Sequence, residues 1–115
     1  MVEASDGKLL SQMRKGTLAY CVLALLAEEE LYGFELVRAL GEVDGMLTSE
    51  GTIYPLLARL RRDGLLTSSW RESSQGPPRR YYGLTAKGKE ALGEFVKEWR
   101  RFRQGVDHLV EGRAR

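Results

Sequence analysis

Apolar residues recur at helical spacing in four parts of the chain, which predicts four helices. The first is expected from about Gln12 to Ala27, with Leu18, Val22, Leu25 and Leu26 on one face. Before it, residues 1–10 are polar and have no clear period. We therefore expect a flexible N-terminal arm ahead of the first helix.

A second, shorter helix is predicted from Phe34 to Gly41, where Phe34, Val37 and Leu40 recur at three-residue steps. Tyr32-Gly33 is expected to form the turn that precedes it. The loop that follows contains Gly45, a residue free to adopt positive φ.

The third helix is predicted after Thr48 and Ser49, which are good N-cap residues. Proline inside a helix removes a hydrogen bond and clashes with the carbonyl four residues earlier, so Pro55 is placed early in this helix, with Gly51 at that earlier position. The apolar stripe expected to face the core consists of Ile53, Leu56, Leu57 and Leu60.

Two segments rich in Thr, Ser, Trp and Tyr predict strands at Leu65–Glu72 and Arg79–Leu84. Residues 73–78, Ser-Ser-Gln-Gly-Pro-Pro, form the expected turn between them. An isolated hairpin is barely stable in water, so it must pack against the helices. Helices followed by a basic-tipped hairpin and another helix predict a mainly α (α+β) fold, a winged helix-turn-helix with a two-stranded wing.

Thr85 is expected to cap a last helix that runs to about Leu109. Its apolar residues follow a heptad pattern, which is typical of a helix that packs against another helix. They are Leu92, Phe95, Val96, Trp99, Phe102, Val106 and Leu109. A small three-helix domain cannot bury so long a stripe, so the simplest partner is a second copy of the chain. The predicted organisation is thus an arm over 1–10, a winged helix-turn-helix over 11–84, and a dimerisation helix and tail over 85–115.

Composition excludes several classes of protein. No apolar run approaches the roughly 18 residues that a membrane-spanning helix needs, so no membrane association is expected. Cys21 and His108 are the only cysteine and histidine, which argues against a disulfide scaffold, a metal site or a nucleophile–base pair. We expect a cytoplasmic, nucleoid-associated protein that is not an enzyme and needs no cofactor.

The net charge of +2 conceals an uneven distribution. Residues 28–44 carry six acids and only one base, Arg38, so the rest of the chain has a surplus of seven positive charges. Such segregation suits a protein that turns one face toward a polyanion such as double-stranded DNA.

The motif Gly51-Thr52-Ile53-Tyr54-Pro55-x-Leu57-x-Arg59-Leu60-x-x-x-Gly64-Leu65 resembles the PadR family of bacterial transcriptional regulators. The similarity continues upstream at Tyr32-Gly33 and downstream at Arg80-Tyr81-Tyr82-x-Leu84-Thr85-x-x-Gly88. A single C-terminal helix is similar to the shorter PadR subfamily.

The resemblance implies a homodimer, usually a repressor, that binds an inverted-repeat operator. It also implies that the last helix together with the first forms the dimer contact. Tyr54 and its helix neighbours would lie against the DNA backbone, and Arg79 and Arg80 would reach an adjacent minor groove. The candidate DNA-binding residues are Arg14, Lys15, Ser49, Thr52, Tyr54, Arg59, Arg79 and Arg80.

Each candidate has a structural alternative that the sequence leaves open. Ser49, Thr52 and Tyr54 suit capping or packing, and Arg59 suits an ion pair. Arg14 and Lys15 suit a solvated helix face, and the wing arginines suit a solubilised hairpin. A protein-interaction module of the same fold, which does not bind DNA, also remains open.

Trp99 is the candidate ligand-binding residue. Its simplest interpretation is a large side chain in the dimer contact. In short PadR members, which this chain resembles, a tryptophan on this helix stacks on planar drugs, so a planar aromatic small molecule between two copies is a second interpretation. Glu98 is expected to point away and Arg103 to flank the slot, which favours a neutral or anionic compound.

Overall fold

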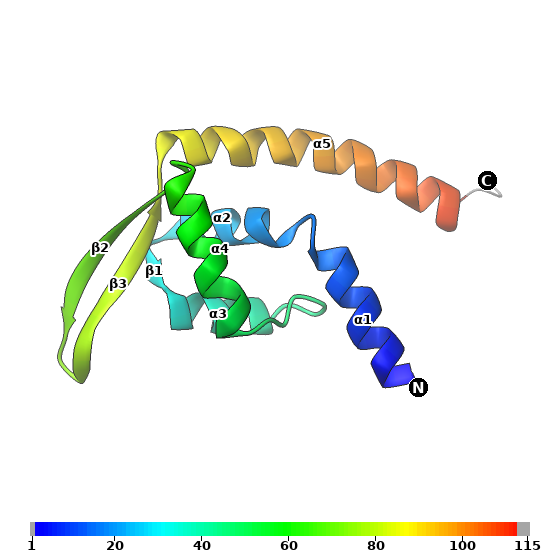
Figure 1. Cartoon of the computed structure of the whole chain (residues 1–115). Helices are drawn as coiled ribbons and strands as arrows, with labels where there is room; N and C mark the ends of the chain where they lie inside the picture. The colour runs from blue at the N-terminus through cyan, green and yellow to red at the C-terminus, as the bar shows by residue number, and fades with distance from the viewer. Residues whose placement is uncertain (1, 113–115) are drawn as a thin grey trace.

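The computed structural model describes residues 2–112, which form five helices and a three-stranded antiparallel sheet (Figure 1). In chain order these are α1 (Val2–Arg14), α2 (Leu18–Glu28), β1 (Leu31–Tyr32), α3 (Gly33–Gly41), α4 (Glu50–Arg62), β2 (Leu66–Ser73), β3 (Gly76–Leu84) and α5 (Ala86–Val110). The predicted α+β class with a winged hairpin and a long last helix is confirmed. Met1 and the end of the predicted tail, residues 113–115, lie outside the described residues.

The core forms where α2, α3 and α4 meet the base of the hairpin, the end of it that holds Leu66 and Tyr82. Its buried members are Leu18, Val22, Leu23, Leu26, Leu36, Leu40, Ile53, Leu57, Leu60, Leu66 and Tyr82. Most residues of the predicted apolar stripes belong to this cluster or pack against it. Phe34 does not, because it is 45% exposed, and Leu36 is buried in its place. Burying one such aliphatic side chain contributes about 1.5–3 kcal/mol, so this cluster fixes α4 against the sheet.

The N-terminal region differs from the prediction. The chain is helical from Val2, where an irregular arm was expected, and the expected helix from Gln12 to Ala27 is divided by a turn at residues 15–17. Polar residues such as Lys8 and Gln12 have good helix propensity without an apolar stripe, which explains how α1 forms. Gly16 lies in the turn, where it interrupts the helix.

β1 was missed by the sequence analysis, which placed a turn at Tyr32. Leu31 pairs with Tyr82 and Tyr32 with Tyr81, so β3 is the central strand of the order β1-β3-β2. Tyr32 is also the N-cap residue of α3, and its backbone N–H donates to Glu35 Oε1 at 3.2 Å. A strand this short is defined by its distant partner and not by its own sequence.

The hairpin is longer than predicted. Ser73 pairs with Gly76, so only Ser74 and Gln75 form the turn. Pro77 and Pro78 belong to β3 and lie opposite a register shift between Arg71 and Ser73. A bulge interrupts the ladder of hydrogen bonds, which is where a strand tolerates proline.

The first turn of α5 is fixed to the end of α4. The Thr85 hydroxyl donates to the carbonyl oxygen of Gly64 at 2.8 Å and accepts from the Gly88 N–H at 2.9 Å, as expected of an N-cap. Gly88 is buried here, and a Cβ at this position would lie 2.7 Å from Leu84 Cδ1. From this anchor α5 extends past α2 and beyond the body of the domain (Figure 1).

Candidate nucleic-acid interface

α4 presents hydroxyl and guanidinium groups on its exposed surface. Ser49 is the N-cap residue, but its side chain makes no capping bond; its Oγ instead donates to Thr52 Oγ1 at 3.3 Å. Thr52 and Arg59 are both exposed and two helical turns apart, so they lie on the same side of α4. Ile53, Leu57 and Leu60 are buried on the opposite side, which fixes the orientation of this surface.

Tyr54 joins α4 to α3. Its ring lies over Gly33, where an added Cβ would be only 2.6 Å from Tyr54 Cζ. The side chain nevertheless remains 42% exposed. Partial burial raises the pKa of the Tyr54 hydroxyl, and the Glu50 carboxylate adds to the increase, followed by Tyr82 and Tyr32. Tyr54 thus has a packing role while part of its side chain stays exposed, and its contact with DNA stays a prediction.

The two wing arginines lie on opposite faces of the hairpin, because neighbouring residues of a strand alternate in direction. The inner face of the hairpin is the one that carries Trp70 and Arg80 together with the buried Leu66 and Tyr82. On this face the Arg80 guanidinium lies 4.8 Å from the centre of the Trp70 ring. Trp70 is not among the residues predicted from the sequence to contact DNA, although an indole beside a basic strand is a recognisable signal.

The outer face of the hairpin is defined by Arg71, Arg79 and Tyr81. The Arg79 guanidinium lies 4.6 Å from the centre of the Tyr32 ring, and that of Arg71 lies 4.3 Å from the Tyr81 ring. Arg71 also forms an ion pair with Glu30. One member of the acidic segment therefore contacts the wing through Arg71, and the outer-face arginines are held along the sheet.

Arg14 and Lys15 differ in their surroundings. Arg14 is half-buried, and its Nη1 donates to the carbonyl oxygen of Gly45 at 2.9 Å. Gly45 has a φ of 85°, the positive value expected from the sequence. Arg14 therefore fastens the end of α1 to the α3–α4 loop (residues 42–49), whereas Lys15 is exposed in the turn before α2.

The apolar stripe of α5 divides into two parts. Leu92 packs against the core of its own chain, and Phe95 stacks on Tyr20 of α2 with ring centres 4.2 Å apart. Farther along, Phe102 is 65% and Leu109 70% exposed. Val96, Val106 and Val110 are exposed as well. Trp99 lies between the two parts, 5.9 Å from Phe95 and 6.2 Å from Phe102 by ring centres.

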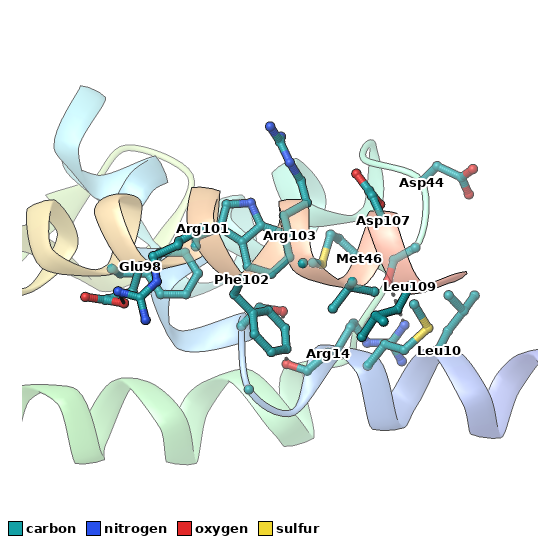
Figure 2. Close-up of a pocket in the computed structure, with 18 residues that line it drawn as sticks. Leu10, Arg14, Asp44, Met46, Glu98, Arg101, Phe102, Arg103, Asp107 and Leu109 are labelled. Carbon is teal, nitrogen blue, oxygen red and sulfur yellow. Dashed lines mark hydrogen bonds and ion pairs between the residues drawn. The ribbon is translucent and has the colours of Figure 1, made fainter. Parts of the chain in front are cut away.

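A groove of about 1310 Å³ runs between α1, the α3–α4 loop and the second part of α5. Figure 2 shows Leu10, Met46 and Phe102 among the side chains that line it, and Trp99 lines it too. Its charged residues are Arg14, Asp44, Glu98, Arg101, Arg103 and Asp107. Glu98 lies at one end of the groove, where its side chain is 68% exposed and its Oε1 is 3.9 Å from Arg101 Nη1 (Figure 2). Charges of both signs line it, so the groove favours neither an anionic nor a cationic ligand.

Other types of site find little support in the part of the chain that the structure describes. There, no three His, Cys, Asp or Glu side chains are grouped as metal ligands would be. Cys21 is half-buried on α2, and burial raises the pKa of its thiol. No helix within residues 2–112 combines the length and apolarity that crossing a bilayer requires.

Comparison with known proteins identifies relatives of the chain. Residues 22–94 match the model of the transcriptional regulator PadR-like family. A transcriptional regulator from Mycobacterium tuberculosis is 35% identical over 85 residues, which are 74% of this chain and 78% of that protein. The crystal structure of a PadR-like transcriptional regulator from Bacillus cereus has a TM-score of 0.79 at 41% identity, covering 87% of this chain and 97% of that one. For a PadR family transcriptional regulator from Eggerthella lenta the TM-score is 0.83 at 34% identity, with 96% of each chain covered.

Proposed function

Because the chain belongs to the PadR-like family of transcriptional regulators, we propose that it binds double-stranded DNA as a homodimer and represses transcription. The family membership also means that the chain is a regulator and not an enzyme. The arrangement of its residues supports DNA binding, assembly and ligand response in different ways.

The observation that carries the proposal is that one core orients both α4 and the hairpin. Ile53 and Leu57 on α4 pack in the same cluster as Leu66 and Tyr82 on the hairpin. The exposed side of α4, with Thr52 and Arg59, is thereby held at a fixed angle to the wing arginines. Hydroxyl and backbone contacts of α4 would set the register on the duplex, and the guanidiniums would neutralise phosphates.

Dimerisation is supported by the second part of α5. Phe102 and Leu109 are large apolar side chains that remain mostly exposed in the described part of the chain. A second copy that packs along this stripe and the adjoining groove would bury them and bring two α4 helices together. In such dimers the two helices enter successive major grooves about 34 Å apart, which matches an inverted repeat.

Relief of repression by a planar aromatic molecule is supported by the position of Trp99. This residue borders the groove and forms part of a row of rings with Phe95 and Phe102. A flat ligand that stacks there would also contact the α3–α4 loop, which leads into α4. Ligand binding would thus shift the helix that contacts DNA. Emission from Trp99 would report such stacking directly.

The central experiment combines Arg79→Ala with Arg80→Ala and measures binding to a duplex selected from a random library. We expect weaker binding and a flatter dependence of log affinity on log salt, by about 0.9 for each phosphate that is no longer neutralised. The matched control is Arg62→Ala, which removes an exposed charge at the end of α4. Affinity and slope that stay unchanged in the double variant would remove the wing from the interface. A native protein that selects no duplex would refute DNA binding itself.

A further inference from the structure

Trp70 is an apolar side chain that the fold does not use. It is 63% exposed, although Leu66 and Tyr82 on the same face of the hairpin are buried in the core. Trp70 is more exposed because the helices cover the inner face only at the base of the hairpin, around Leu66 and Tyr82. An indole that is mostly exposed to water adds little to the stability of the domain. Tryptophan is, however, enriched at surfaces where proteins contact their partners.

Arg80 depends on this indole for its position. Its guanidinium lies 4.8 Å from the ring centre, in cation–π contact, and Arg80 is only half-buried. A guanidinium that rests on a ring by its flat side keeps the N–H groups at its edge available as donors. Trp70 therefore restricts the conformations of Arg80 without occupying the groups that bind phosphate.

The outer face provides a contrast. Arg71 is paired with Glu30 and lies over Tyr81, and Arg79 lies over Tyr32 at the base of the sheet. The Arg71 guanidinium is thus paired with a carboxylate, and that of Arg79 rests on a ring of β1, on the face opposite the core. Glu72, an exposed acid on the hairpin, is at the register shift and so leaves the regular alternation of faces. The inner face thus combines a cation with an open apolar surface beside α4.

We propose that Trp70 is a DNA-contacting residue, whose indole packs against a deoxyribose of the backbone while Arg80, held on its ring, donates to the adjacent phosphate. This inference rests on the proposed DNA binding. It assigns the wing contact to the inner face and makes Arg80 more important than Arg79. Sugar and phosphate are the chemistry that an apolar ring next to a cation recognises, and they are present in every duplex.

The test uses the full native chain and its Trp70→Phe variant, whose emission comes from Trp99 alone, so that the difference between the two gives the emission of Trp70. A duplex selected by the native protein from a random library is added, and quenching of Trp70 emission by acrylamide is measured with and without it. We expect the duplex to protect Trp70 from this neutral quencher. Protection that the Trp70→Phe variant also shows belongs to Trp99 and serves as the control, and the affinity of this variant for the duplex is measured independently of emission.

Affinity measurements complete the test. Trp70→Ala should weaken binding about five- to tenfold, and Trp70→Phe should retain most of it, since a ring still supports Arg80. Arg80→Ala should cost more than Arg79→Ala. Both Trp70 variants should fold as the native chain does, because this side chain lies outside the core. Native affinity in Trp70→Ala, or equal quenching of Trp70 with and without duplex, would overturn the inference and leave DNA binding intact. No binding by the native protein would instead refute the proposed function.

Discussion

The two parts of α5 have the same apolar pattern but different surroundings. Leu92 and Phe95 in the first part pack against the core and against Tyr20 of the same chain. Phe102 and Leu109 in the second part are mostly exposed. A heptad pattern therefore indicates that a helix has an apolar face, but the fold decides which turns of it are covered within the chain. The second part is the one left without cover, so the interface that we propose between copies would be shorter than the sequence pattern predicts.

The largest expected effect comes from placing charge on the second part. Phe102→Glu with Leu109→Glu should convert the proposed dimer into a folded monomer, since carboxylates cannot be buried unpaired between helices. Loss of the second DNA-binding unit should lower affinity for an inverted repeat on the order of 100-fold. Light scattering after size-exclusion chromatography gives the mass, and a duplex titration gives the affinity.

The control for this prediction lies on the opposite side of the same helix. Lys97→Glu changes an exposed residue of α5 whose Nζ lies 3.8 Å from Glu94 Oε2, so only a weak surface pair is removed. This variant should keep the mass and affinity of the native protein. A dimeric double-glutamate variant would show that the copies associate through another surface.

Two glycines of α5 allow the first part to be compared with the second in terms of stability. Gly88→Ala should destabilise the chain by about 1–3 kcal/mol, because the added Cβ would overlap Leu65 O and Leu84. At Gly105 no atom lies within 4 Å of an added Cβ. Gly105→Ala should therefore stabilise the helix by about 0.5–1 kcal/mol.

Urea unfolding monitored by circular dichroism measures both glycine variants. Equal effects at the two positions would contradict the view that only the first turns of α5 are tightly packed. A large loss of stability at Gly105 would mean that the partner's helix approaches α5 closely there, which would refine the proposed dimer contact.

The smallest effect is expected at Trp99, where the two parts meet. In a Trp70→Phe variant the remaining emission comes from Trp99, and planar aromatic compounds of either charge should quench it as they stack in the groove. Cationic and anionic compounds should differ little, because the groove is lined by charges of both signs. Emission that stays constant across such a panel would remove the ligand from the proposed function.

The sequence predicted most of the fold because most of it depends on local patterns. Ile53, Leu57 and Leu60 follow the helical period, and Thr85 caps α5 as expected. β1 could not be predicted, since Leu31 becomes a strand only by pairing with Tyr82, which is far away in the chain. The division of the first helix coincides with Gly16, a poor helix former inside an otherwise helical apolar pattern.

The candidate site was predicted less completely than the fold. Arg79 and Arg80 are adjacent in sequence and were treated together, yet a strand sends them to opposite faces. Arg14 is a candidate for phosphate binding, and the structure gives it a hydrogen bond to Gly45 that no sequence pattern indicates. Its contact with DNA remains a prediction, as do those of the other site residues.

The contact of the Tyr54 ring with Gly33 limits how this protein could be engineered toward a new operator. In a library that varies position 33 while position 54 keeps an aromatic ring, that ring would have to leave its place, because a side chain at position 33 would overlap it. Shortening residue 54 first would vacate this space and let both positions diversify together. Substitutions at position 33 would thus be tolerated best after position 54 has changed, and a laboratory evolution experiment would select them in that order.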